Sequence, residues 1–247
     1  MNVNWLSLVH CEETDSTNNQ VKNFDSDKEM TVLTTQYQKA GRGQRGNSWE
    51  SGKSQNLLFS ILIHPNYVTA SHQFCLSQAI SLAIAQTLAE YTPGISIKWP
   101  NDIYWNNRKI CGILIENDLM GKFIQNCIIG IGLNVNQQKF LSDAPNPISL
   151  YQILGHETPC EEVLAKILTR FHQMLNLIKE GNTADIIQAY HNHLYRRTGL
   201  HPYKDEKGTF MAHIIGVEPQ GFLVLCDEQG TERRYAFKEV SYIINLG

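Results

Sequence analysis

Three predicted strands in the middle of the chain are joined by very short turns, and this feature constrains the fold most strongly. They run over residues 95–99, continuing irregularly to 105, over 109–116 and over 123–134. The connections contain Asn106-Asn107 and Gly121, which favour tight turns. Because such turns join antiparallel neighbours, the segment predicts an antiparallel sheet. Residues 110–115 are apolar at nearly every position, so we expect this strand to be central and covered on both faces.

The remaining segments add helices and further strands. Residues 31–37 and 57–63 are rich in β-branched or apolar side chains and indicate strands. Apolar spacing and N-cap residues predict helices over 18–24, 71–91, 161–179 and 184–195. Beyond residue 196 the pattern changes to short β runs over 210–217, 222–226, 234–237 and 240–244. We therefore predict an α+β fold, in which a mixed, mostly antiparallel sheet carries packed helices (residues 1–195) and a small β-barrel follows (residues 196–247).

Composition and charge exclude several classes of protein. The 247 residues are 42% hydrophobic and 18% charged, which suffices for a full-sized core. A net charge of -3 gives no global basic field, so we expect no nucleic acid partner. The sequence shows neither a secretory leader pattern nor an apolar run of about 18 residues, so we predict a cytoplasmic protein that does not enter a membrane. The six cysteines form no C-x-x-C pair and are expected to be buried, reduced thiols.

A glycine-rich segment follows the predicted strand at 31–37. Gly41-Arg-Gly-Gln-Arg-Gly46 has the G-x-G-x-x-G spacing of a dinucleotide-binding loop. Such a loop also needs a helix at its last glycine and an acidic residue about 20 positions further on, and neither is present. The glycines instead free the backbone to close over a ligand, while Arg42 and Arg45 offer guanidinium groups to an anion. This predicts a phosphate-binding lid, although a plain solvated turn has a similar composition.

Polar residues also interrupt the three central strands. Lys98-Trp-Pro-Asn-Asp102 breaks a strand with proline, which costs ladder hydrogen bonds and indicates a use other than folding. A hairpin through Asn106-Asn107 would place Asn101 and Asp102 opposite Cys111 and Gly112, where the missing side chain leaves room for a ligand. Gly130-Ile-Gly-Leu-Asn134 ends the third strand with two glycines and an amide. Each feature alone has an ordinary explanation, such as a turn, a core tryptophan or a solvated lysine at Lys109, but together they converge on one sheet.

These segments resemble the ordered motifs of biotin protein ligases. The matching segments are Glu13–Asn18, Gln38–Gly46 with Trp49, Lys98–Asp102, Arg108–Glu116 and Gly130–Asn136, and the resemblance covers roughly residues 10 to 247. It implies a class II synthetase-like catalytic domain and an SH3-like C-terminal barrel. It also implies a ligase that activates biotin with ATP and Mg²⁺ to biotinyl-5'-AMP and transfers biotin to a lysine of a biotin carboxyl carrier domain.

The resemblance assigns roles to particular residues. Lys109 and Arg42 would be catalytic, as cations that meet the biotin carboxylate and the α-phosphate, where phosphoryl transfer needs charge stabilisation. The implied biotin-binding residues are Ser16, Thr17, Asn18, Gln38, Arg42, Gly43, Gln44, Lys109 and Gly112. The implied nucleotide-binding residues are Arg45, Trp49, Lys98, Asn101, Asp102 and Asn134. Hydroxyl and amide side chains can satisfy both the donors and the acceptor of a cyclic urea. The sequence identifies neither the metal ligands nor a dedicated general base, for which Asp102 is the nearest candidate.

Gln44 departs from the family pattern, in which arginine is common at this loop position, and Asn47 stands where another basic residue often follows. Fewer cations weaken the hold on a negatively charged adenylate. We therefore expect biotinyl-AMP to dissociate faster from this chain than from an arginine-bearing relative. A side-by-side measurement of intermediate release tests this, and equal or slower release from this chain would contradict it.

Two alternatives stay open at the level of sequence. One is a lipoate or octanoate protein ligase or transferase of the same fold, against which the glycine segment and Lys98–Asp102 favour biotin. The other is a non-catalytic nucleotide- or vitamin-binding module, against which the cations Arg42 and Lys109 favour catalysis. Because the first motif begins at Glu13, we expect a monofunctional enzyme without the N-terminal DNA-binding domain of some relatives. Neither the carrier protein nor the choice between monomer and homodimer follows from the sequence.

Overall fold

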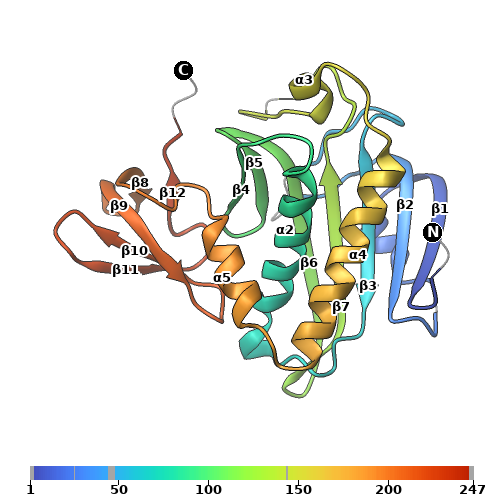
Figure 1. The fold of residues 1–247 in the computed structure, drawn as a ribbon, viewed down its shortest axis with the longest axis horizontal. Helices are drawn as coiled ribbons and strands as arrows, with labels where there is room; N and C mark the ends of the chain where they lie inside the picture. The colour runs from blue at the N-terminus through green and yellow to red at the C-terminus, as the bar shows by residue number, and fades with distance from the viewer. Residues whose placement is uncertain (1–2, 25, 44–47, 143, 245–247) are drawn as a thin grey trace.

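The main sheet has seven strands in the order β1-β2-β3-β7-β6-β5-β4 (Figure 1). The computed structural model describes residues 3–24, 26–43, 48–142 and 144–244. The strands are β1 Leu6–Thr14, β2 Met30–Gln38, β3 Leu57–Ile63, β4 Ile95–Lys98, β5 Asp102–Trp105, β6 Arg108–Met120 and β7 Phe123–Leu133. Strands β1 and β2 run parallel, and the other neighbouring pairs run antiparallel. The predicted mixed, mostly antiparallel sheet is confirmed.

A second, smaller sheet is formed by the C-terminal part of the chain. Its strands are β8 His201–Asp205, β9 Gly208–Val217, β10 Leu223–Asp227, β11 Glu232–Tyr235 and β12 Ser241–Tyr242. They are antiparallel and lie in the order β11-β10-β9-β8-β12 (Figure 1, left). This confirms a small C-terminal β module. Its closure into an SH3-like barrel and the domain boundary at 195/196 stay predictions.

Helices cover one face of the main sheet and leave most of the other face to α1 and the loops. The helices are α1 Thr17–Val21, α2 Phe74–Leu88, α3 Leu150–Leu154, α4 Cys160–Lys179 and α5 Ala184–Asn192, with a 3-10 turn at Ala70–His72. Helices α2 and α4 lie side by side across the sheet (Figure 1). Successive side chains of β7 point to opposite faces of the sheet. Ile129 belongs to the main core, whereas Ile128 packs with Val21 of α1 in a separate small cluster. None of the helices in the described part of the chain has the length and hydropathy to span a bilayer.

The structure corrects the prediction of one strand over 95–105. Strands β4 and β5 fold back on each other at residues 99–101, with Lys98 opposite Asp102. Pro100 has no N–H to continue a ladder, so the chain turns there. The predicted pairing of Asp102 with Gly112 is confirmed, but Asn101 does not lie opposite Cys111, which pairs with Ile103. The prediction that β6 is covered on both faces is wrong, because Gly112 and Leu114 line a cavity.

Other differences concern elements that long-range contacts define. The sequence analysis missed β1, β8 and α3. Helix α5 ends at Asn192, earlier than predicted, because the following residues pair with the edge strand β4. There Ile97 donates its N–H to the His193 carbonyl at 2.7 Å, and Tyr195 donates its N–H to the Ile97 carbonyl at 2.8 Å. The six cysteines are free as predicted, but four of them are partly buried and the fully buried ones are Cys111 and Cys127.

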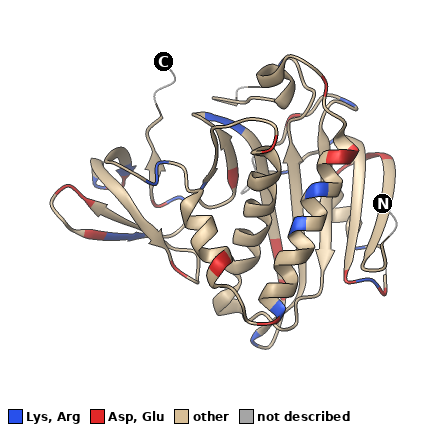
Figure 2. Ribbon diagram, viewed as in Figure 1, with Lys and Arg blue, Asp and Glu red and all other residues tan. Residues whose placement is uncertain are grey.

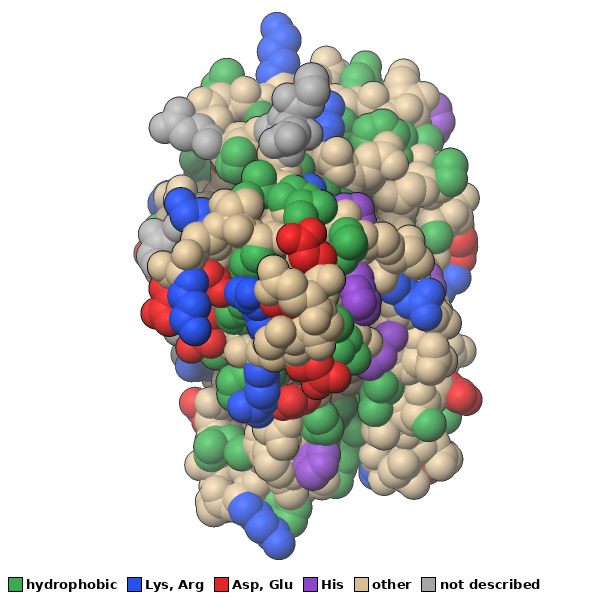
Figure 3. All heavy atoms as spheres, turned by 90° about the vertical axis from the view of Figure 1, so that its left-hand side faces the viewer, with side chains coloured by type: hydrophobic (Ala, Val, Ile, Leu, Met, Phe, Trp, Pro, Cys, Tyr) green, Lys and Arg blue, Asp and Glu red, His purple; other side chains and the backbone are tan. Residues whose placement is uncertain are grey.

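Charged side chains of the small sheet are largely paired with each other. Arg233 contacts Asp205 and Asp227 at 3.4 and 2.8 Å, and Arg234 contacts Glu218 at 2.7 Å. Figure 2 shows acidic and basic residues together along these strands, and Figure 3, which faces the small sheet, shows them interspersed on the surface. The absence of a nucleic acid partner stays a prediction.

Contacts between the small sheet and the main domain fix residues 237–242 next to the main sheet. Trp99 Nε1 donates to the Gly221 carbonyl at 2.9 Å, and its ring meets Phe237 edge-on at 6.3 Å. On α5, His191 Nε2 accepts the N–H of Val217 at 3.2 Å. Burial lowers the pKa of His191, which favours the neutral ring that this bond requires.

Tyr190 of α5 offers a test of how the core is packed. It is fully buried and meets Phe74 edge-on, and its hydroxyl has no hydrogen-bond partner among the described residues. An unpaired buried hydroxyl costs about 1–3 kcal/mol, so we expect Tyr190→Phe to raise the free energy of unfolding by about 1 kcal/mol in urea denaturation. Tyr195→Phe is the control, because the Tyr195 hydroxyl donates to Asn107 Oδ1 at 2.7 Å and its loss should destabilise. A clear loss of stability in Tyr190→Phe would contradict the prediction.

Candidate active site

A cavity of about 1080 Å³ lies on the sheet face opposite α2 and α4 and extends to the small sheet. Its floor contains Gly112 and Leu114 of β6, which pair in register with Gly132 and Gly130 of β7. These positions share one face because side chains alternate along a strand. A side chain at Gly130 would overlap the Asn18 amide, and one at Gly132 would overlap the Trp49 ring. The two glycines therefore make room for other parts of this chain.

Most of the residues assigned from the sequence line this cavity. They are Ser16, Thr17, Asn18, Gln38, Arg42, Gly43, Trp49, Lys98, Asn101, Asp102, Lys109, Gly112 and Asn134. Gln44 and Arg45 lie outside the described residues.

Hydrogen bonds join the start of α1 to the end of β2 and the middle of β3. Gln38 Oε1 accepts the Thr17 N–H at 2.8 Å and the Thr17 hydroxyl at 3.2 Å. Ser60 Oγ lies 2.7 Å from Thr17 Oγ1 and 2.6 Å from Asn18 Oδ1. Ser60 is fully buried, and Thr17 and Asn18 are each 3% exposed. These buried bonds fix the orientation of the polar groups that face the cavity.

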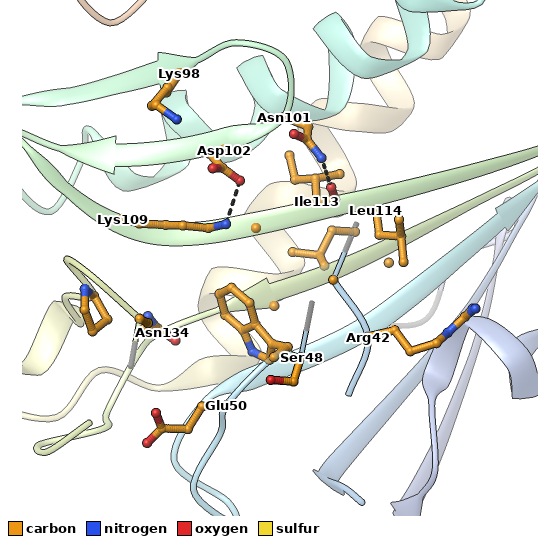
Figure 4. A pocket seen from close by; sticks show the side chains of 18 of the residues that line it. Arg42, Ser48, Glu50, Lys98, Asn101, Asp102, Lys109, Ile113, Leu114 and Asn134 are labelled. Atoms are coloured by element: carbon orange, nitrogen blue, oxygen red, sulfur yellow. Dashed lines mark hydrogen bonds and ion pairs between the residues drawn. The ribbon is translucent and has the colours of Figure 1, made fainter. Parts of the chain in front are cut away.

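Glu116 links this polar cluster to the glycine-rich segment. Its Oε2 accepts Asn18 Nδ2 at 2.8 Å and Arg42 Nη2 at 3.0 Å. Arg42 consequently points away from Lys109 (Figure 4). The sequence analysis assigned these two cations to one carboxylate and phosphate, and the structure does not bring them together in this conformation.

Lys109 and Asp102 form an ion pair beside Trp49 in the middle of the cavity. Lys109 Nζ lies 2.7 Å from Asp102 Oδ1 and 5.7 Å from the centre of the Trp49 ring (Figure 4). The Lys109 side chain is 32% exposed, so its ammonium can still reach a ligand. Trp49 Nε1 is buried without a partner among the described residues. The room that Gly112 leaves is thus partly filled by Trp49 and Lys109.

The remaining polar side chains of the central motifs are partly used in structure. Asn101 Nδ2 donates to the Ile113 carbonyl, and Asn134 Nδ2 donates to the Ile148 carbonyl at 3.1 Å. Asn134 Oδ1 is buried and has no partner in the described part of the chain. Lys98 Nζ lies over the rings of Tyr104 and Tyr242 at 5.2 and 5.0 Å, and burial lowers its pKa. Lys98 thereby joins the main domain to the small sheet.

Several residues of the site were missed by the sequence analysis. Ser60 and Glu116 do not line the cavity but bond to the lining residues Thr17, Asn18 and Arg42. Both carried detectable signals, because Ser60 is a polar residue inside an apolar strand and Glu116 shares a face with Gly112 by alternation. Residues 140–142, 144–147, 237, 238 and 240–242 also line the cavity, and tertiary structure alone brings them there. No group of three or more His, Cys, Asp or Glu side chains that could hold a metal ion occurs among the described residues.

Comparisons with known proteins agree with this geometry. The model of the biotin/lipoate A/B protein ligase family matches residues 10–134, about half of the chain. The bifunctional ligase/repressor BirA of Bacillus spizizenii is 29% identical over 216 residues, which cover 84% of this chain and 65% of that protein. The biotin--[acetyl-CoA-carboxylase] ligase of Paracoccus denitrificans is 29% identical over 208 residues, which cover 78% of this chain and 82% of that protein.

Solved structures include a similar fold. The biotin protein ligase from Aquifex aeolicus, in complex with biotin and ATP, superposes with a TM-score of 0.79 at 28% identity, covering 95% of this chain and 97% of that one. The chain spans less than two thirds of the Bacillus relative, at 65% of its length.

Proposed function

Because this chain belongs to the biotin/lipoate A/B protein ligase family, we propose that it is a biotin protein ligase. It would activate biotin with ATP to biotinyl-5'-AMP and transfer the biotinyl group to a lysine of a biotin carboxyl carrier domain. The resemblance to a ligase solved with biotin and ATP supports this choice within the family.

The observation that carries the proposal is a buried polar cluster and a cation in the same cavity. Thr17, Gln38 and Ser16 present hydroxyl and amide groups at one end, and Lys109 presents an ammonium in the middle. A cyclic urea has donors and an acceptor in one plane, which such groups can satisfy. The dithiolane of lipoate and the alkyl chain of octanoate have no such N–H groups, and they would leave these buried polar groups unpaired.

Adenylation would join the two anionic substrates at Lys109. A biotin carboxylate oxygen attacks the α-phosphorus, the bond from that phosphorus to the bridging oxygen of the β-phosphate breaks, and pyrophosphate leaves. Lys109 offsets the charge that gathers at the α-phosphate, and Asp102 holds the ammonium in place. Arg42 would add a second cation only after leaving Glu116.

Magnesium fits this site as a companion of ATP. Mg²⁺ usually keeps several waters and binds through substrate phosphates with one or two protein oxygens, so it needs no preformed cluster. The unpaired Asn134 Oδ1 is the protein oxygen that would hold it on the nucleotide side, because the Asp102 carboxylate is paired with Lys109. When bound, it would neutralise charge on the phosphates.

Transfer would form an amide bond on the carrier. The neutral amine of the carrier lysine attacks the biotinyl carbonyl carbon, the bond to AMP breaks, and AMP leaves with the electron pair. The amine loses a proton in this step, and Asp102 is the acceptor that we propose. The carrier domain as partner and the cytoplasmic location stay predictions, as does the choice between monomer and homodimer.

Pyrophosphate release with ATP and Mg²⁺ tests the function. Biotin, lipoate and octanoate are supplied separately, with and without a biotin carrier domain whose mass is then measured. Release that depends on biotin, with a biotinyl mass gain on the carrier lysine, is expected. Pyrophosphate release with lipoate or octanoate instead would identify that acid as the substrate. No release with any of the three acids would favour a non-catalytic binding module.

A further inference from the structure

Glu50 is a carboxylate of the cavity wall that the proposed reaction does not use. Its Oε1 accepts the N–H of Leu141 at 2.8 Å and Nε2 of Gln137 at 3.1 Å, and its Oε2 accepts the N–H of Ser142 at 2.7 Å. Burial alone would raise the pKa of Glu50, but the hydrogen bonds from Ser142 and Leu141 outweigh it and lower the pKa below the ordinary value. Glu50 is therefore ionised at neutral pH, and these bonds are charge-assisted.

These bonds join two segments that are far apart in the sequence. Glu50 follows Trp49 directly, and Trp49 donates its N–H to the Gly41 carbonyl at 2.9 Å, which ties Glu50 to the glycine-rich segment. Leu141 and Ser142 belong to the segment that follows β7, residues 137–142 and 144–147, of which 140–142 and 144–147 line the cavity (Figure 4 shows Glu50 at its edge). Glu50 thus bridges two walls of one cavity.

Both ends of this segment also have bonds that do not involve Glu50. Gln137 is 2% exposed, and its Oε1 accepts Asn56 Nδ2 at 2.6 Å and the Gly52 N–H at 3.1 Å. At the other end, Asn146 accepts the N–H of Lys109 at 2.7 Å and donates Nδ2 to the Asn107 carbonyl at 2.6 Å. Loss of the Glu50 carboxylate should therefore release the middle of the segment and leave its ends in place.

The middle of this segment presents apolar side chains at the rim of the cavity. Phe140 and Leu141 line it, and the Leu141 side chain is 90% exposed. An exposed leucine held at a cavity rim gains burial when a ligand with an apolar face covers it. The flat faces of a nucleotide base fit this description, and the aromatic ring of Trp49 lines the same cavity.

We propose that Glu50 is a positioning residue for ATP, which holds residues 140–142 in place as a wall of the nucleotide site before ATP binds. Its role is indirect, because its carboxylate oxygens are already bonded to the amides of Leu141 and Ser142 and to the Gln137 side chain. The inference rests on the proposed function, which names ATP as the ligand of this part of the cavity.

The kinetic test compares Glu50→Ala and Glu50→Gln with wild type. We expect Glu50→Ala to raise the KM for ATP about 10- to 100-fold through the loss of the two charge-assisted bonds to the Leu141 and Ser142 amides, with kcat and the Kd for biotin changed by less than about threefold. Glu50→Gln keeps one acceptor oxygen, so its KM for ATP should lie between those of wild type and Glu50→Ala. An unchanged KM for ATP in Glu50→Ala, or an equal loss of biotin affinity, would overturn the proposal.

Glu90→Ala is the matched control. Glu90 is likewise a hydrogen-bonded carboxylate, with Lys166 and Arg170 as its donors, but it lies outside the residues that line the cavity. Its removal should leave the KM for ATP unchanged. A similar rise in both variants would assign the effect to general destabilisation and overturn the proposal.

Two readouts without turnover separate this inference from the proposed function. The backbone amides of Leu141 and Ser142 should be protected from hydrogen exchange in wild type without ligands and lose this protection in Glu50→Ala. Calorimetry measures ATP binding in the absence of biotin and should show the same 10- to 100-fold weakening. If wild type releases no pyrophosphate with any acid, the proposed function fails, and calorimetry still decides the role of Glu50.

Discussion

Lys109→Ala is expected to slow the formation of biotinyl-AMP by about 10²- to 10³-fold, the usual effect of removing one preorganised electrostatic donor. Lys109 is the second residue of β6 and its side chain is partly exposed, so its truncation should leave the fold intact. The measurement is biotin-dependent pyrophosphate release in a single turnover. Lys122→Ala, in the turn between β6 and β7, is the control and should keep the wild-type rate. A near-wild-type rate in Lys109→Ala would assign the role to another cation.

The ion pair with Asp102 sharpens this prediction. Removal of Lys109 leaves the Asp102 carboxylate without its partner at 2.7 Å, where it repels the two anionic substrates. The double variant Lys109→Ala with Asp102→Asn should therefore recover part of the lost rate, about threefold to tenfold. A double variant slower than Lys109→Ala alone would show that Asp102 acts in adenylation in its own right.

Gly130→Ala is expected to weaken biotin binding about 100-fold. The added Cβ would overlap the Asn18 side-chain amide, so Asn18 must move. Its bonds to Ser60 at 2.6 Å and to Glu116 at 2.8 Å are then lost, and each buried bond contributes about 1–3 kcal/mol when its partners are left unpaired. Titration calorimetry with biotin measures the change.

The control for this prediction is Gly216→Ala in β9. A Cβ there would meet only the His191 ring, at 3.2 Å, away from the cavity. This variant should bind biotin as wild type does. If Gly130→Ala binds biotin normally, the network from Gln38 to Glu116 does not determine the affinity, and the ligand lies elsewhere in the cavity.

Local patterns predicted the elements that local forces define. The apolar run at 57–63 coincides with β3, and the short turn at Asn106-Asn107 correctly placed Asp102 opposite Gly112. Both follow from side-chain type and loop length over a few residues. The edge strand β1 was missed, because its polar and apolar residues become a strand only through pairing with β2.

Long-range packing decided the parts of the site that the sequence could not. Sequence spacing alone gave no reason to place Glu50 against Leu141 and Ser142, or residues 237–242 against the cavity, because neither set lies near the motifs in the chain. The position of Arg42 was also decided in this way, since its pairing with Glu116 depends on two segments that meet across the sheet.

The glycines of β6 and β7 show what the sequence and the tertiary structure each determine. The sequence determined that Gly112 and Gly132 leave space on one face of the sheet, because the missing side chain and the alternation along a strand are local properties. Only the tertiary structure decided what enters that space, which is the Trp49 ring. The physical reason is that an absent side chain defines a volume, whereas its occupant depends on packing between segments far apart in the chain.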